Sequence, residues 1–133
     1  MKNVVLDSSA LVAYLQGEAG RRMIKDILVQ ARRHEIEVSM SAMNLSEVVY
    51  AIARGRGRDG ARRVAEWLSQ LPLTIEPVDR DEAVNAGLLR HRFGLSYGDC
   101  FAVALAHRLK AEVLTSDPDF EKVQEMVRVV WIR

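Results

Sequence analysis

Short apolar segments rich in β-branched residues alternate along the chain with longer segments whose apolar residues recur at helical spacing. The short segments show little polar alternation, which is typical of strands buried on both faces of a parallel sheet. We expect five strands, at residues 4–6, 36–40, 73–78, 112–115 and 127–131. Because the first is early and strongly apolar, we expect it to lie in the middle of the sheet.

The longer segments predict helices, most of which carry a start or stop signal. Ser8 or Ser9 is expected to cap a helix that Gly17 ends, and Ser41 is expected to cap another. The predicted helices cover residues 8–16, 20–33, 41–54, 61–71, 79–92 and 96–109, with a short one from 117. Helix 96–109 is apolar or small on almost every side, which indicates a central position. This alternation predicts an α/β fold with a parallel sheet covered on both faces.

One segment, residues 55–60, is predicted to be a loop, since it combines three glycines with charged residues. Five of the ten residues from Arg54 to Arg63 are arginine. Arginine suits forked contacts with phosphate better than lysine does. The segment is therefore either a solvated flexible loop or a contact for a phosphate or a partner.

The composition indicates one folded domain and excludes several classes of protein. With 133 residues, 49% apolar and 28% charged, we expect one folded domain over residues 1–133. The net charge of +1 predicts no strong overall field. A single cysteine, Cys100, excludes an internal disulfide and a multi-thiolate metal site. No apolar stretch approaches the roughly 20 residues of a membrane span, so we expect a cytoplasmic protein without membrane contact.

Four acidic residues lie just past predicted strands or within predicted helices: Asp7, Glu47, Asp99 and Asp117. Asp7 directly follows a strand and Asp117 lies two residues beyond another, and open α/β sheets bind ligands beyond the carboxyl ends of their strands. Each acid also has a purely structural alternative. Asp7 and Asp117 can cap the helices that follow them. Glu47 can be a solvated residue opposite an apolar stripe, and Asp99 can form a capping box with Ser96.

The four acids together indicate a cation more strongly than any one of them does alone. Clustered carboxylates repel one another, and one of them becomes neutral unless a cation lies among them. Oxygen ligands alone select Mg²⁺ or Mn²⁺ over zinc. Gly98, a poor helix residue beside Asp99, suits the close approach of a ligand or backbone. His107 is more typical of a core or surface histidine than of a base, and Cys100 has no histidine partner that would make it a nucleophile.

Four segments resemble the motifs of the PIN-domain family, in particular the VapC group of bacterial and archaeal toxins. They are residues 6–11 (LDSSAL), 44–48 (NLSEV), 95–106 (LSYGDCFAVALA) and 114–120 (LTSDPDF). Their order and spacing match over almost the whole chain. The resemblance implies a three-layer α/β/α sandwich with a central parallel five-stranded sheet. It also implies an endoribonuclease that depends on Mg²⁺ or Mn²⁺.

The resemblance also implies roles for individual residues. The catalytic and metal-binding quartet would consist of Asp7, Glu47, Asp99 and Asp117. Thr115 would support it by hydrogen bonding, and Asp119 would be peripheral. The implied partners are an RNA substrate, a cognate antitoxin and a second copy in a homodimer, possibly within a larger toxin–antitoxin assembly. Arginines at the rim, with Arg54, Arg56 and Arg58 as candidates, would contact RNA phosphates.

Other functions stay open at this stage. A PIN-like nuclease of RNA processing would share the same motifs, and so would an inactive RNA-binding or assembly module. The presence of all four acids gives no support to a loss of activity. A phosphatase with Asp7 as nucleophile would need a second acid two residues later or a nearby catalytic lysine. The chain has Ser9 at that position and no lysine near it in the sequence.

Overall fold

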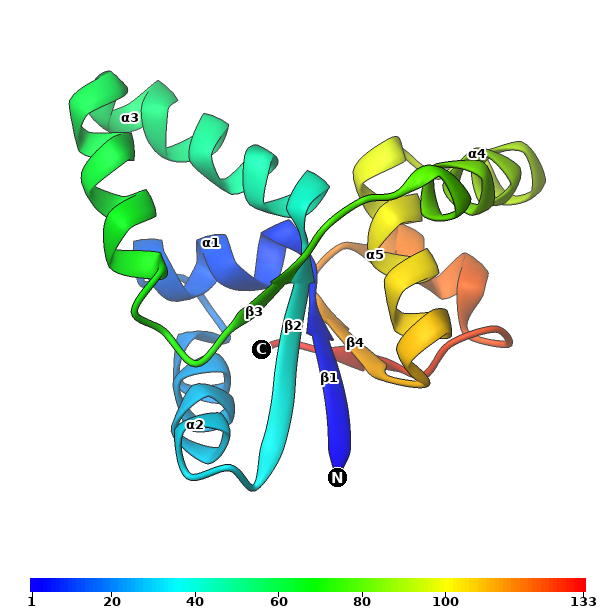
Figure 1. The fold of residues 1–133 in the computed structure, drawn as a ribbon, viewed down its shortest axis with the longest axis horizontal. Coiled ribbons are helices and arrows are strands. Elements are labelled where there is room, and N and C mark those ends of the chain that lie inside the picture. Colours follow the sequence, from blue (N-terminus) through cyan, green and yellow to red (C-terminus); the bar gives the residue numbers. More distant parts are fainter.

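The computed structural model describes all residues, 1–133, and its centre is a five-stranded parallel sheet (Figure 1). The strands are β1 (Lys2–Leu6), β2 (Ile36–Ser41), β3 (Thr74–Glu76), β4 (Glu112–Thr115) and β5 (Val129–Trp131). Their order is β3-β2-β1-β4-β5, and every neighbouring pair is parallel. The five predicted strands and the central place of the first are therefore confirmed.

Helices cover both faces of the sheet, which confirms the three-layer α/β/α sandwich. They are α1 (Ser8–Gln16), α2 (Arg21–Arg32), α3 (Ala42–Leu68), α4 (Arg80–Phe93), α5 (Tyr97–Leu109) and the short 3₁₀ helix η1 (Pro118–Val123). Successive residues of a strand point to opposite faces. Val4 and Leu6 accordingly pack in one core with α1, α2 and α3, whereas Val5 packs with α4 and α5 in the other. As predicted, α5 is buried along most of its length.

The loop predicted at residues 55–60 is wrong. α3 runs from Ala42 to Leu68, and a single residue inside it, Gly57, leaves helical geometry (φ 73°, ψ 177°). Glycine adopts this positive φ without the steric cost that a Cβ imposes. Figure 1 shows that α3 reverses direction and descends toward α1, so the element is a hairpin of two helices. The predicted helix end at 71 is also late, because α3 ends at Leu68.

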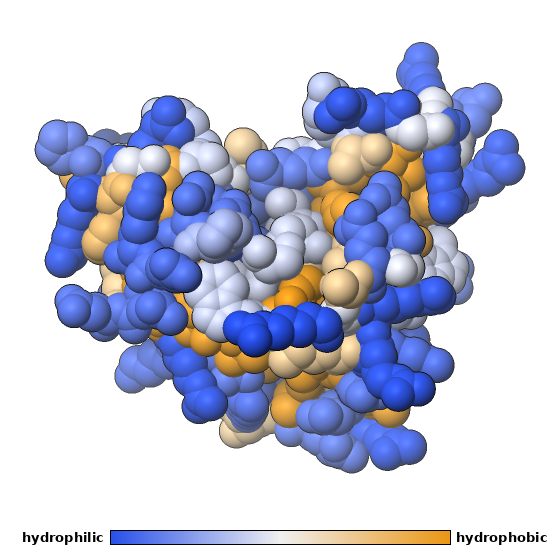
Figure 2. Space-filling view, turned by 180° about the vertical axis from the view of Figure 1, so that it is seen from behind, coloured by the Kyte–Doolittle hydropathy of each residue, from blue (hydrophilic) through white to orange (hydrophobic).

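The carboxyl ends of β1 and β4 meet at one edge of the sheet. Leu6 pairs with Leu114, and the backbone N–H of Asp7 donates to the Leu114 carbonyl at 3.2 Å. α3 begins at the same edge because β2 is parallel to β1. Seen from behind in Figure 2, the parts raised on either side carry mostly hydrophilic side chains, and the outline dips between them. None of the helices combines the length and apolar character needed to cross a membrane.

Candidate active site

Asp7 lies at the carboxyl end of β1 and is the N-cap of α1. Its Oδ1 accepts the backbone N–H of Ala10 at 2.9 Å and the hydroxyl of Ser9 at 2.7 Å. The capping role predicted for Ser8 or Ser9 is therefore wrong, since Asp7 itself performs it. The side chain is 1% exposed, and burial raises the pKa of its carboxyl group. Hydrogen bonds from Thr115, Ser9 and Ala10 partly offset this effect.

Two hydroxyl groups connect Asp7 to the loop that carries Asp117. Thr115 donates to Oδ2 of Asp7 at 2.6 Å and accepts the backbone N–H of Asp117 at 2.9 Å. Ser9 donates to Asp7 and accepts the backbone N–H of Ser116 at 3.1 Å. The carboxylate of Asp7 is thus held from both oxygens. The part played by Ser9 was not anticipated, because the bond to Ser116 joins residues 107 positions apart.

Asp99 lies in the first turn of α5, close enough to Asp7 and Asp117 for their charges to act on it. The carboxylates of Asp99, Asp117 and Asp119 each offer an oxygen, and these oxygens lie within 4.8 Å of one another. Asp99 is 8% exposed, and its Oδ2 is buried without a hydrogen-bond partner. Burial first, then the charges of Asp117 and Asp7, raise the pKa of Asp99 to about 7. Asp119, expected to be peripheral, belongs to this group.

Half of the capping box predicted at the start of α5 is present. The hydroxyl of Ser96 accepts the backbone N–H of Asp99 at 3.3 Å. The reciprocal bond, from the Ser96 N–H to the Asp99 carboxylate, is not formed. The side chain of Asp99 lies among the other acids, and its Oδ2 remains without a hydrogen-bond partner.

Glu47 approaches the same region from α3, and Asn44 holds it. The amide of Asn44 donates to Oε1 of Glu47 at 2.9 Å and to the carbonyl of Gly98 at 3.0 Å. Asn44 is 1% exposed, and its Oδ1 is buried without a partner. A Cβ on Gly98 would collide with the carboxylate of Glu47. Gly98 is therefore the residue that lets α3 and α5 approach closely at the site.

These residues fit a hard divalent cation. Asp99 offers a buried carboxylate oxygen without a donor, although burial of such an atom costs free energy unless something compensates it. The nearby oxygens of Asp117 and Asp119 are also carboxylates, and the sulfur and imidazole ligands that zinc prefers do not share the group. Burial and the charge of Asp99 raise the pKa of the Cys100 thiol, which keeps the thiol protonated.

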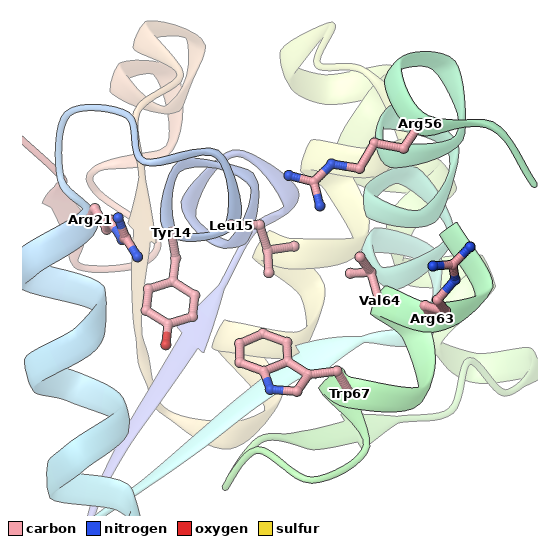
Figure 3. Close-up of a pocket in the computed structure, with 7 residues that line it drawn as sticks. All are labelled: Tyr14, Leu15, Arg21, Arg56, Arg63, Val64 and Trp67. Atoms are coloured by element: carbon pink, nitrogen blue, oxygen red, sulfur yellow. The ribbon is translucent and has the colours of Figure 1, made fainter. Parts of the chain in front are cut away.

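The three arginines proposed as RNA contacts do not share one position. Arg54 follows Glu47 by seven residues, two helical turns, so it lies on the same side of α3. Its guanidinium group stacks over the ring of Tyr50 at 5.8 Å. Arg56 instead lines a cavity between α1 and α3, whereas Arg58 does not line it (Figure 3). The RNA contacts of all three stay a prediction.

Known proteins share this fold and much of this sequence. The PIN domain family model matches residues 4–126. Ribonuclease VapC of Mycolicibacterium smegmatis is 34% identical over 110 residues, which are 77% of this chain and 82% of that protein. Ribonuclease VapC30 of Mycobacterium tuberculosis is 32% identical over 125 residues, 89% of this chain and 92% of that protein.

A solved structure gives the same result for the fold. The structure of VapBC2 from Rickettsia felis, bound to a DNA fragment from its promoter, superposes with a TM-score of 0.75 at 12% identity. The match covers 98% of this chain and 99% of that chain. At such low identity, the likeness shows the fold alone. With the family model and the curated relatives, it leads to one conclusion: the chain belongs to the PIN-domain family, among the VapC proteins.

Proposed function

We propose that this chain is a metal-dependent endoribonuclease and the toxin of a toxin–antitoxin pair, built as one nuclease domain over residues 1–133. One observation carries the proposal: the buried, unpartnered carboxylate oxygen of Asp99 lies beside two further carboxylates at the edge where β1 and β4 end. The relatives are named ribonucleases, and a protein that cleaves RNA with hard cations needs such a cluster.

Asp7, Glu47, Asp99 and Asp117 would hold Mg²⁺ or Mn²⁺, with Asp119 within reach of the same cation. Thr115 and Ser9 keep Asp7 in one orientation, and Asn44 does the same for Glu47. Such outer hydrogen bonds fix the direction in which a carboxylate offers its lone pairs. Asp99 would lose its proton near neutral pH when a cation offsets its repulsion from Asp117.

A bound cation would supply a more acidic water and would neutralise charge on the phosphate oxygens. The acids would hold the cation, and with it the scissile phosphate, near their edge of the sheet, and no covalent enzyme intermediate is needed. The RNA phosphates must approach a negative cluster, so arginines around it would offset repulsion and make affinity depend on salt. Arg54, on the side of α3 that carries Glu47, is the best placed of the three candidates.

The proposed partners follow from the family. The R. felis neighbour is a complex of VapB and VapC on promoter DNA. We infer that this chain likewise pairs with an antitoxin, forms a homodimer and acts in the cytoplasm. Co-expression with the antitoxin and measurement of mass by light scattering would test the assembly.

The test of the proposed function is cleavage of an RNA of mixed sequence with Mg²⁺, with Mn²⁺ and with EDTA. We expect wild-type chain to cleave with either cation and to stop with EDTA. Asp7→Asn and Asp99→Asn should lose at least the roughly 10–100-fold that follows removal of an outer-shell partner. Asp26→Asn is the matched control, since it removes the same charge from an exposed position on α2. Equal cleavage by all variants would sink the assigned site.

A further inference from the structure

A cavity of about 370 Å³ lies between the end of α1 and the second half of α3, and none of the four acids lines it. Two aromatic rings, Tyr14 and Trp67, face it, and Arg21, Arg56 and Arg63 surround it (Figure 3). Its volume falls within the range of about 300–1,000 Å³ typical of small-ligand sites. The proposed reaction uses none of these side chains, so the acidic site does not explain why they share one cavity.

The three arginines give the cavity an uncompensated positive charge. All four ion pairs of the molecule use Lys2, Arg108 or Arg128 as the basic partner. Arg21, Arg56 and Arg63 are exposed and have no carboxylate partner. Guanidinium groups that line one cavity without a counter-ion favour an anion, and their planar fork matches phosphate oxygens.

The aromatic pair adds a second kind of recognition. The rings of Tyr14 and Trp67 are nearly parallel, with an interplanar angle of 10° and centroids 6.3 Å apart. Trp67 is 44% exposed although it is large and apolar. A flat apolar surface beside guanidinium groups matches a ligand that has both a planar ring and a phosphate. That combination is a nucleotide, because aromatic faces stack bases of any sequence and arginines hold the backbone.

We propose that this cavity binds a nucleotide of the single-stranded RNA that the acids cleave, at a distance from the scissile phosphate. The inference rests on the proposed function. α1 links the two places, since Asp7 caps its start and Tyr14 follows seven residues later. At a rise of about 1.5 Å per residue, the cavity lies about 10 Å along the helix from Asp7. A stacked strand advances about 3.4 Å per nucleotide, so about three nucleotides span the distance.

An acidic peptide is the rival ligand, because carboxylates also pair with arginine. The aromatic pair favours RNA, since two parallel rings with an exposed edge offer stacking that acidic side chains do not use. The chemistry of the rival makes it a separate arm of the test. It predicts binding of a glutamate-rich peptide and no change in RNA affinity when the cavity is altered.

The test measures binding of a fluorescent single-stranded RNA of twelve or so nucleotides to chains that also carry Asp99→Asn, which prevents cleavage. Arg56→Ala with Arg63→Ala removes two charges from the cavity. Arg33→Ala with Arg62→Ala removes the same charge from two exposed positions outside the cavity. We expect the cavity pair to raise the Kd at least about tenfold more than the control pair. RNA should also quench Trp67 emission, a signal that Trp67→Phe removes.

Equal weakening by the two arginine pairs would overturn the proposal, because general electrostatics would then explain the binding. Loss of glutamate-peptide binding in the cavity pair, with unchanged RNA affinity, would overturn it in favour of a protein partner. Hydrolysis of bis(p-nitrophenyl) phosphate separates this proposal from the proposed function. This small diester needs only the acids, so we expect Arg63→Ala without Asp99→Asn to hydrolyse it at the wild-type rate. If the wild-type chain fails to hydrolyse it, the proposed function is contradicted. The difference in RNA affinity between the cavity pair and the control pair still tests whether the cavity binds RNA.

Discussion

Asp7 and Asp99 are two buried carboxylates at one edge of the sheet, and their surroundings are opposite. Asp7 accepts hydrogen bonds from Ser9, Ala10 and Thr115. Asp99 has a buried oxygen with no donor at all and faces the like charge of Asp117. Burial raises the pKa of both carboxyl groups. Three hydrogen bonds offset the effect at Asp7, whereas at Asp99 only one, with Ser96, does so, and the charges of Asp117 and Asp7 add to the rise. Asp7 is therefore part of the folded framework, whereas Asp99 is left for something outside the chain.

The contrast separates stability from function at positions that look equivalent in sequence. A carboxylate that caps a helix and accepts three donors stabilises the fold whether or not it binds a cation. A carboxylate that is buried beside like charges destabilises the fold and is tolerated where function requires it. The two positions should accordingly respond in opposite ways to the same truncation.

The largest expected effect is on activity and stability together. Asp7→Ala and Asp99→Ala should both lower RNA cleavage by more than about 100-fold, beyond the range for loss of an outer partner. Asp7→Ala should also lower the free energy of unfolding by about 2–4 kcal/mol, because a cap is lost and buried donors are left unpaired. Asp99→Ala, measured without metal at pH 8, should leave stability equal or higher. Urea unfolding of both variants checks the difference.

Equal destabilisation by the two alanine variants would end the distinction. The Asp26→Ala variant on α2 serves as the control for loss of an exposed acid. Its effect on stability should stay within about 0.5 kcal/mol.

The next effect concerns the hydroxyl that holds Asp7. Thr115→Val removes the donor to Asp7 and the acceptor for the Asp117 N–H, while it keeps the shape of the side chain. We expect cleavage to fall about 10–100-fold, as for other partners that orient a metal-binding carboxylate. Thr115→Ser restores the hydroxyl and should recover most of the activity. If Thr115→Val and Thr115→Ser cleave at the same rate, the hydroxyl does not orient Asp7.

The sequence is sufficient for the layers of the fold but not for the hairpin in α3. The apolar pattern locates the strands and most helices, because a strand that is buried on both faces of the sheet is a nearly continuous run of apolar residues. The segment around Gly57 has the glycine and arginine content of a loop, yet helical hydrogen bonding resumes directly after one residue. Packing decides this point: Trp67 in the returning half stacks on Tyr14 of α1. The amino-acid composition of the segment around Gly57 does not indicate that contact.

The candidate site, like the fold, can be predicted from the sequence only in part. The four acids can be listed from sequence because short motifs surround them, and their catalytic role stays a prediction. Only the fold brings Asn44, Ser9 and Asp119 to the site. The hydrogen bond from Asn44 to the Gly98 carbonyl spans 54 positions of the sequence, and the one from the Ser116 N–H to Ser9 spans 107. The supporting hydrogen bonds are long-range, and a single sequence records no such pairing.

A smaller effect tests the close contact between α3 and α5. Gly98→Ala puts a Cβ into the carboxylate of Glu47, so Glu47 must move. Cleavage should fall about tenfold, less than the 10²-fold that a 1 Å misplacement can cost. Gly87→Ala is the matched control, since a Cβ there has nothing within 4 Å in the middle of α4. It should raise stability by up to about 1 kcal/mol and leave cleavage unchanged.

The smallest effect is the pH dependence that Asp99 adds to the stability of the metal-free chain. The folded pKa of Asp99 is about 7 and its ordinary value is 3.8, so the folded state binds this proton more tightly than the unfolded state. Stability should then fall as pH rises between about 4 and 7, because folding in this range takes up a proton, and proton uptake becomes less favourable as pH rises. The slope is at most about 1.4 kcal/mol per pH unit. Urea unfolding at pH 5.5 and 8 should show a loss of about 1–2 kcal/mol in wild type that Asp99→Asn largely removes. A fall of the same size in Asp99→Asn would assign the pH dependence to Asp7 or to another group, and the contrast between the two carboxylates would then lose its electrostatic basis.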